Sequence, residues 1–432
     1  MKSEEFVIFR NLINYPLLRD MALLSEVAPE IEHADRAFIQ GICASVHDLL
    51  EFAAAHGFSG NVWKLYLTER IVNDENAFSL SCERRQMPDN SLYEAALSDI
   101  SILKEIADCD FKALAERTGI KQIACLSFFR TDPSRSVYYS HTIRDAIASL
   151  SDAMFGGAAA EEMLLSLARF YGEYGVGAPG LHKAFRVEKD ASGVSIVPIR
   201  NIRHVRLSDL VGYEEAKRTL TENTEAFLAG RPANNCLLYG DAGTGKSTSI
   251  MAIANAYFPR GLRVIELYKH QSELLHEVIN QIKNRNYRFI IYMDDLSFEE
   301  FETEYKYLKA VIEGGLEKKP ENLLIYATSN RRHLIRETFK DKPALLDDDV
   351  HRGETVQEKL SLVHRFGVTI YYGAPSRADY LEIVRTLADR AGLDGMDEET
   401  LAKEAERFAM QHGNRSGRTA TQLIDELLGK RP

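Results

Sequence analysis

The sequence contains the motif G-x-x-x-x-G-K-S at Gly240-Asp241-Ala242-Gly243-Thr244-Gly245-Lys246-Ser247. Residues 236–239 form a short apolar run before the motif, and residues 249–256 have the pattern of a helix after it. This strand–loop–helix context is the one that a phosphate-binding loop requires. Glycines permit the positive φ angles that turn successive N–H groups toward an anion, and the helix N-terminus adds partial positive charge. The motif therefore predicts that the chain binds a nucleoside triphosphate.

Two side chains of this loop have distinct predicted roles. Lys246 is expected to reach the β- and γ-phosphates, and Ser247 is expected to ligate Mg²⁺. The sequence has no Asn-Lys-x-Asp signature for guanine, so ATP is the expected nucleotide. The residues predicted to bind it in this segment are Gly240, Asp241, Ala242, Gly243, Thr244, Gly245, Lys246, Ser247 and Thr248.

A second apolar run, residues 288–293, ends in the two carboxylates Asp294 and Asp295. In open parallel sheets ligands bind beyond the carboxyl ends of the strands, so both side chains are expected beside the phosphates. Asp294 is predicted to hold the Mg²⁺ shell together with Ser247, and Asp295 to lie near the γ-phosphate.

Length and composition indicate several folded domains. A chain of 432 residues is too long for one ordinary core and suggests about two to four domains. The hydrophobic fraction of 45% and charged fraction of 27% are typical of soluble globular proteins. No apolar run approaches the length of a transmembrane helix, and the acidic N-terminus lacks the basic flank of a signal peptide, so a cytoplasmic location is expected. The five cysteines show no C-x-x-C spacing, which indicates neither a zinc site nor a disulfide framework.

The net charge of −11 is spread along the chain, and there is no basic arm. Because Lys and Arg that neutralise phosphates supply most non-specific affinity for nucleic acids, an acidic chain is a poor candidate for a DNA- or RNA-binding surface. A local cluster could still form one, and its members are Arg331, Arg332, His333 and Arg336.

The pattern along the chain predicts three folded regions and a linker. Residues 1–175 have apolar side chains at three- and four-residue spacing, which predicts a mainly helical N-terminal domain of unknown role. Residues 176–204 are expected to be a linker with a hairpin, its strands at 185–188 and 194–197. Residues 205–373 alternate strand and helix patterns, which favours a parallel sheet with strands at 236–239, 262–267, 289–293, 323–328 and 368–372. Ser376 is a helix cap for a small helical bundle within residues 374–432.

Seven segments carry a resemblance to a known family: DLVGYE (209–214), LYGDAGTGKS (238–247), DDLSFE (294–299), YATSNRR (326–332), EKLSL (358–362), RFG (365–367) and SGR (416–418). In this order they resemble the AAA+ ATPases, and more closely a bacterial group of ATP-binding proteins of unknown function. The resemblance covers about residues 205–425. It implies an α/β fold in which a P-loop AAA+ domain with a five-stranded parallel sheet is followed by a C-terminal helical lid and preceded by a mainly helical N-terminal domain.

The resemblance also implies roles for residues in the nucleotide-binding domain. Val211 and Gly212 are similar to the segment that borders the adenine. Asn330 resembles sensor 1, a polar group that would orient the attacking water together with Asp295; its alternative role is a turn-forming Asn after a strand.

Two arginines resemble functional arginines of the family. Arg365 is similar to the arginine finger that one subunit inserts into its neighbour's site, which implies a homo-oligomer, either a ring or a dimer. A local ion pair with an acid such as Asp349 or Glu358 is its alternative. Arg418 resembles sensor 2 of the lid; Arg415 competes for that role, and both are also compatible with ordinary surface arginines.

One departure from the family concerns catalysis. Most AAA+ enzymes have Asp-Glu where this chain has Asp294-Asp295, and the glutamate is their general base. Asp295 is shorter by one methylene, so hydrolysis is expected to be slow or to depend on closure of the site. Glu299 is a substitute base, although a solvated loop position is the simpler interpretation, and the same holds for a second cation site at Asp347, Asp348 and Asp349.

The leading interpretation is an AAA+ ATPase that hydrolyses Mg²⁺-bound ATP at subunit interfaces and remodels or assembles a protein partner held by residues 1–200. Its catalytic residues would be Asp295, Asn330, Arg365 and Arg418. A second interpretation is an ATP-dependent assembly switch or scaffold with slow hydrolysis. A nucleic-acid-linked loader is a third, which the acidic charge disfavours. A small-molecule kinase is a fourth, for which sensor and finger motifs have no obvious use.

Overall fold

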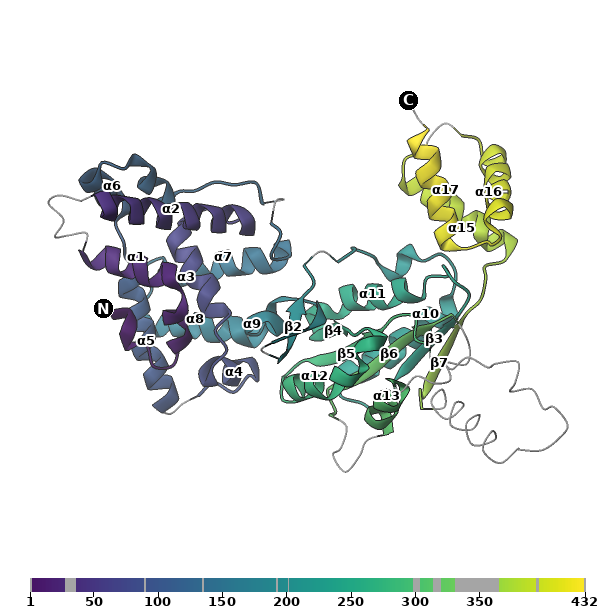
Figure 1. Cartoon of the computed structure of the whole chain (residues 1–432), viewed down its shortest axis with the longest axis horizontal. Helices are drawn as coiled ribbons and strands as arrows, with labels where there is room; N and C mark the ends of the chain where they lie inside the picture. The colour runs from purple at the N-terminus through teal and green to yellow at the C-terminus, as the bar shows by residue number, and fades with distance from the viewer. Residues whose placement is uncertain are drawn as a thin grey trace. The chain divides into compact units, whose positions relative to one another are not determined.

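The computed structural model describes residues 2–27, 36–88, 91–133, 136–191, 193–200, 202–297, 304–313, 320–330, 365–393 and 396–430. The chain divides into two compact units, Met1–His182 and Lys183–Pro432, and Figure 1 shows the elements of each. No helix within the described ranges is both long and apolar enough to cross a membrane. Glu299, the cluster at 331–336 and the acids at 347–349 lie outside the described residues.

The first unit is helical, as the spacing of its apolar residues predicts. Its helices are α1 (Pro16–Val27), α2 (Arg36–His56), α3 (Val62–Val72), α4 (Ala77–Glu83), α5 (Ser91–Ala107), α6 (Phe111–Thr118), α7 (His141–Phe155), α8 (Ala160–Glu173) and α9 (Gly177–Leu181). Asn61 and Ser140 cap α3 and α7 by accepting hydrogen bonds from main-chain N–H groups of the first turn. The core includes Trp63, which is fully buried and donates from its indole nitrogen to the carbonyl of Ile106 at 3.0 Å.

The second unit is built on a seven-stranded sheet. Its strands are β1 (Ala184–Asp190), β2 (Gly193–Pro198), β3 (Cys236–Gly240), β4 (Leu262–Glu266), β5 (Arg288–Met293), β6 (Leu323–Ser329) and β7 (Val368–Tyr372), in the order β2-β1-β4-β5-β6-β3-β7. All five predicted strands are present and parallel, which confirms the α/β class.

The strand number was predicted as five, and the structure has seven. The predicted hairpin forms β1 and β2, and β1 also pairs in parallel with β4, with Phe185 opposite Ile265. Phe185 and Val187 are buried on β1, so this strand has an apolar face to cover. The hairpin is therefore an extension of the sheet.

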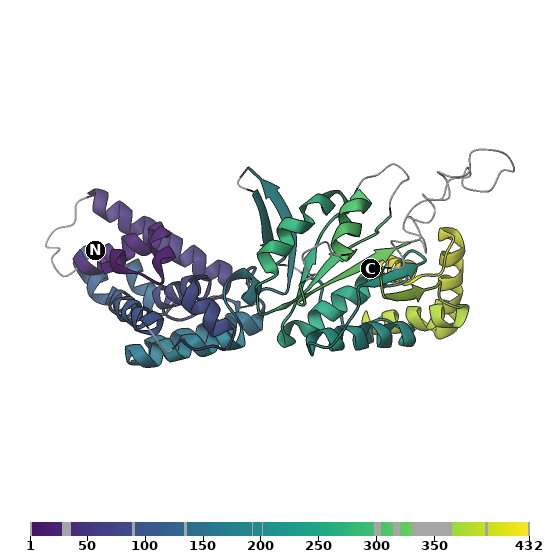
Figure 2. The same ribbon diagram turned by 90° about the horizontal axis from the view of Figure 1, so that it is seen from below.

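Helices cover both faces of this sheet (Figures 1 and 2). α10 (Glu214–Leu228) and α11 (Lys246–Tyr257) pack on the face that carries Leu238, Tyr292 and Tyr326. α12 (Leu275–Ile282) and α13 (Glu304–Glu313) lie on the other side. β3 lies between β6 and the edge strand β7, while β4, the next strand in the sequence, lies three strands away. In open α/β sheets such a point of reversal marks where ligands bind.

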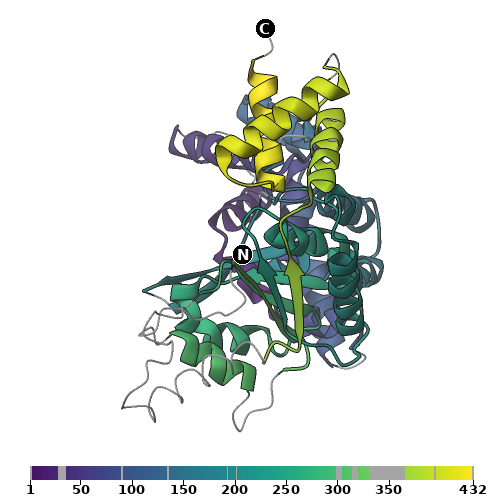
Figure 3. The same ribbon diagram turned by 90° about the vertical axis from the view of Figure 1, so that its right-hand side faces the viewer.

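A three-helix bundle follows β7 (Figure 3). Its helices are α15 (Arg377–Arg390), α16 (Glu398–His412) and α17 (Gly417–Gly429), and they share an apolar core that includes Tyr380, Phe408 and Leu423. Ser376 caps α15 through a capping box with Asp379, as the sequence predicts. We call this bundle the lid.

Candidate functional site

The predicted phosphate loop connects β3 to α11, and its three glycines have positive φ angles that other residues rarely adopt. Gly240 has φ +136°, and a Cβ there would lie 2.1 Å from the carbonyl oxygen of Tyr372. Gly245 has φ +97°, and a Cβ there would lie 2.4 Å from a side-chain carbon of Leu210. These positions require glycine because both the backbone conformation and the neighbouring atoms exclude a side chain.

Lys246 is the first residue of α11 and is 6% exposed. Its ammonium donates to the carbonyl oxygens of Gly240 and Asp241, at 2.9 and 2.6 Å. Burial lowers its pKa, although the carboxylates of Asp241, Asp295 and Asp294 act in the opposite direction. The side chain is thus a cation directed along the phosphate loop, where phosphate oxygens would compete with the two carbonyls for its protons.

Asp294 lies where β5 ends and is held by hydroxyl groups from two other elements. Ser247 on α11 and Thr328 on β6 both donate to its Oδ1, at 2.8 and 2.5 Å. Burial by itself would raise the pKa of this carboxyl, but the hydroxyls of Thr328, Tyr292 and Ser247 lower it. A charged carboxylate beside a serine hydroxyl offers the hard oxygen ligands that Mg²⁺ binds, so these residues fit the predicted magnesium site.

Asp295 has a positive φ of +49°, an uncommon value for a residue other than glycine. Its main-chain N–H donates to the hydroxyl of Thr328 at 2.9 Å, and its Oδ1 accepts from the amide of Asn330 at 2.8 Å. The structure therefore brings the predicted base and the predicted sensor 1 residue into direct contact.

Thr328 is a functional candidate that sequence reasoning missed. Its hydroxyl contacts both acids of the site, and its carbonyl accepts the N–H of Leu296 at 2.7 Å. A threonine in a strand is ordinary, so the only available signal was its place two residues before Asn330 on the strand beside β5.

These groups surround a cavity of about 800 Å³ between the sheet, the phosphate loop and the lid. The predicted residues on its wall are Val211, Ala242, Gly243, Thr244, Gly245, Lys246, Ser247, Thr248, Asp294, Asp295, Asn330 and Arg418. Four other predicted site residues are not among the described residues that line the cavity: Gly212, Gly240, Asp241 and Arg365.

The lid supplies part of this wall. Arg418 lies at the start of α17, and its N–H donates to the carbonyl of Gly243 at 3.3 Å. Arg415, the competing sensor 2 candidate, instead pairs with Glu406 at 3.0 Å. Ile383 and Leu387 of α15 also line the cavity and were not singled out from the sequence, because residues four apart on a helix indicate only packing.

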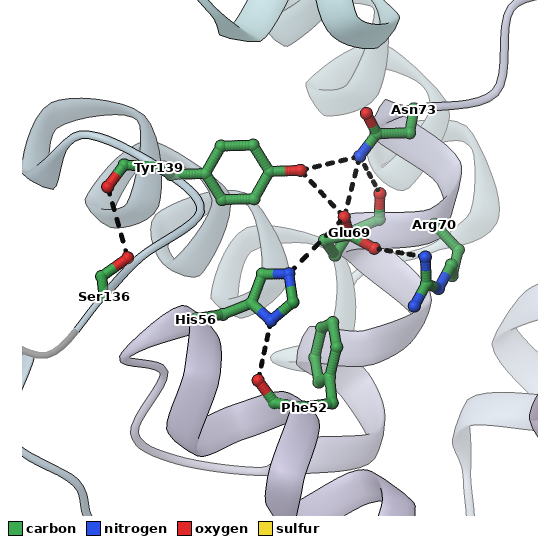
Figure 4. Close-up of polar contacts among 7 residues, drawn as sticks. All are labelled: Phe52, His56, Glu69, Arg70, Asn73, Ser136 and Tyr139. Carbon is green, nitrogen blue, oxygen red and sulfur yellow. Dashed lines mark hydrogen bonds and ion pairs between the residues drawn. The ribbon is translucent and has the colours of Figure 1, made fainter. Parts of the chain in front are cut away.

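A second polar cluster lies inside the first unit (Figure 4). Glu69 of α3 is 5% exposed, and its Oε1 accepts from the hydroxyl of Tyr139 and the amide of Asn73, at 2.8 and 3.0 Å. Arg70 is 3.3 Å from its Oε2, and Nε2 of His56 is 4.0 Å from its Oε1. Burial raises the pKa of Glu69, despite the opposing effects of Arg70 and Tyr139.

Comparisons with known proteins find similarity over parts of the chain. The chain is similar over 66 residues to the replication factor C large subunit of Staphylothermus marinus, with 36% identity over 15% of each chain. Similar solved structures are the Thermotoga maritima RuvB Holliday junction branch migration motor, with a TM-score of 0.35 and 16% identity, and a mutant of the same protein, with a TM-score of 0.37 and 14% identity. Each covers 52% of this chain, and this chain covers 64% of each.

The family comparison covers the whole second unit except its last residue. The model described as "Protein of unknown function (DUF815)" matches residues 180–431, more than half of the chain. This range contains the phosphate loop, the two acids, Asn330 and the lid. The chain therefore belongs to the DUF815 family.

Proposed function

We propose that this protein is an AAA+ ATPase that binds Mg²⁺-ATP in the cavity of the second unit and hydrolyses it at subunit interfaces to remodel or assemble a protein partner. One observation carries the proposal. A single cavity gathers the phosphate loop, both acids at the end of β5, Asn330 and Arg418. Phosphoryl transfer requires positioning and charge stabilisation above all, and these side chains provide both.

Separate residues of the cavity bind the phosphates, the adenine and Mg²⁺ in this proposal. Lys246 and the loop N–H groups bind the phosphates, and Val211, Ile383 and Leu387 offer apolar surface to the adenine ring of ATP. Ser247 and Asp294 hold Mg²⁺, which would neutralise charge on the phosphate oxygens.

Asp295 and Asn330 act on the water. The amide of Asn330 fixes one carboxylate oxygen of Asp295, which leaves Oδ2 to accept the proton of an attacking water. Asp295 is thus held in place by its neighbour while retaining one oxygen for chemistry.

The same contact favours a second function, an ATP-dependent assembly switch with slow hydrolysis. Asp295 is short, has a strained backbone, and already shares one oxygen with Asn330. A base held in this way reaches its water only if the site closes further. Turnover measured per bound ATP separates the two functions.

The interface part of the proposal rests on Arg365. This side chain is half-buried, lies directly before β7 and is not among the described residues that line the chain's own cavity. An arginine in that place can serve a neighbouring subunit's site, which supports a homo-oligomer. The protein partner is proposed to bind through residues 1–200. A nucleic-acid loader remains the alternative suggested by the relative named replication factor C, and the net charge of −11 weighs against it.

Mixing two inactive variants tests the interface. Arg365→Ala retains Asp295 but lacks the finger, whereas Asp295→Asn retains the finger but lacks the base. Mixing them is expected to restore about a quarter of the wild-type ATPase, because some interfaces then combine an intact base with an intact finger. Failure to recover activity at any ratio, with co-assembly shown by light scattering, would assign Arg365 a structural role.

A further inference from the structure

The phosphate loop contains an acid, Asp241, whose negative charge would repel phosphates if it faced them. The structure turns it away. Its Oδ2 accepts the main-chain N–H of Ala374 at 2.8 Å, and its own N–H donates to the carbonyl of Tyr372 at 3.0 Å. A hydrogen bond from an N–H to a carboxylate is about twice as strong as one between neutral groups. Asp241 is therefore hydrogen-bonded to the last residue of β7 and to the segment that follows it.

That segment is the hinge of the lid, which we define as residues 373–376 between β7 and α15. Besides Asp241, the hydroxyl of Tyr213 holds it by donating to the carbonyl of Gly373 at 2.8 Å. Tyr213 lines the nucleotide cavity. Asp241 and Tyr213, which both contact the hinge, thus come from segments of the nucleotide site.

The main chain of Asp241 is bonded to the residue that would bind phosphate. Its carbonyl accepts from the ammonium of Lys246 at 2.6 Å, and the carbonyl of Gly240 accepts from the same group at 2.9 Å. Phosphate oxygens that draw this ammonium toward the cavity would remove donors from both carbonyls. The effect falls on Asp241, whose side chain also accepts the N–H of Ala374 in the hinge.

We propose that Asp241 couples the phosphate loop to the hinge, so that occupation of the loop by the phosphates of a nucleotide changes the position of the lid. This inference rests on the nucleotide site proposed above and extends it to regulation. Asp241 is a positioning residue in this role, because it acts through Lys246 on one side and the N–H of Ala374 on the other. The lid carries Arg418, Ile383 and Leu387 on the cavity wall, so a change at the hinge alters the site itself.

Hydrogen exchange at the hinge tests the coupling in the full-length chain. The exchange rate of the Ala374 amide is measured with and without Mg²⁺ and a saturating ATP analogue that resists hydrolysis. The variants are Asp241→Asn, which keeps an uncharged acceptor, and Asp241→Ala, which removes it. Asp397→Ala is the matched control, since Asp397 caps α16 in the lid by accepting from Thr400 at 3.2 Å but does not contact the hinge.

Without nucleotide, Asp241→Ala should exchange the Ala374 amide roughly tenfold faster than the wild type, with Asp241→Asn between them. Nucleotide should change the wild-type rate by at least about threefold. It should leave Asp241→Ala unchanged, and Asp397→Ala should respond like the wild type. A full nucleotide response in Asp241→Ala would overturn the coupling, as would a wild-type chain that binds the analogue without any change at Ala374. A wild-type chain that binds no nucleotide would instead overturn the proposed function.

Discussion

Each unit of the molecule holds a carboxylate that accepts hydroxyl hydrogen bonds, and the two have opposite electrostatic settings. Asp294 borders an 800 Å³ cavity, and the hydroxyl groups around it lower its pKa. Glu69 lies in the closed interior of the first unit, and burial raises its pKa. The neighbours of Asp294 leave its charge available to a cation, whereas Glu69 pairs with Arg70 of its own helix and accepts from Tyr139, which joins α3 to the segment before α7. Hydrogen bonds alone therefore do not distinguish a binding site from a structural network; access to the charge does.

The strongest effect is expected on ATP affinity, in the unit that holds Asp294. Lys246→Ala removes the only side-chain cation of the phosphate loop, so ATP affinity measured by calorimetry should fall by more than about 100-fold. Lys403→Ala is the matched control, because Lys403 pairs with Glu399 on the exposed surface of the lid. Unchanged affinity in a folded Lys246→Ala protein would contradict the assignment of the loop.

The next effect concerns turnover. Asp295→Asn should retain Mg²⁺-ATP binding and lose hydrolysis by roughly 100- to 10,000-fold, because an amide holds water but cannot take its proton. Asp294→Asn should instead weaken ATP binding and its dependence on Mg²⁺ together. Parental turnover in Asp295→Asn would place the base elsewhere, with Glu299 the first candidate.

The matching test in the first unit is Arg70→Met. It leaves the buried charge of Glu69 without its cation, which should destabilise this unit by about 3–5 kcal/mol. Trp63 is the only tryptophan of the chain and is buried in this unit, so its fluorescence reports unfolding in urea. The double variant Glu69→Gln with Arg70→Met removes both charges and should recover part of the loss. Equal effects of Glu69→Gln in the wild type and in the Arg70→Met variant would show that the pair is not coupled.

The smallest effect is on pH dependence, and its sign differs between the two carboxylates. The raised pKa of Glu69 means that its protonated form is favoured by folding, so its contribution is present at low pH and is lost as the pH rises through the folded pKa. The lowered pKa of Asp294 gives the opposite, a contribution present above the unfolded pKa and lost as the pH falls.

Unfolding in urea between about pH 2 and about pH 8 measures both. Relative to Glu69→Gln, the wild type should lose stability as the pH rises; relative to Asp294→Asn, it should lose stability as the pH falls below about 4. If both differences in unfolding free energy between the wild type and its variant changed with pH in the same direction, the comparison of the two carboxylates would be contradicted.

The sequence predicted the parts of the site that depend on local motifs. The phosphate loop, the acids after β5 and the cap at Ser376 each occupy a few consecutive residues, so their patterns reveal them. The pairing of β1 with β4 was not predictable, since about eighty residues separate Phe185 from Ile265 and register depends on tertiary packing. The contacts of Thr328 and Asp241 were missed for the same reason, because their partners are 34 and 133 residues away.

The hairpin beside β4 has a consequence for how the molecule can be divided. A fragment that begins at residue 205, where the alternating strand and helix pattern starts, would lose β1 and β2 and leave β4 as a bare sheet edge. Buried strands of that kind present unpaired N–H and C=O groups that pair with other chains. A fragment that begins at Lys183 keeps the edge covered, so the two fragments should differ in solubility although they contain the same nucleotide site.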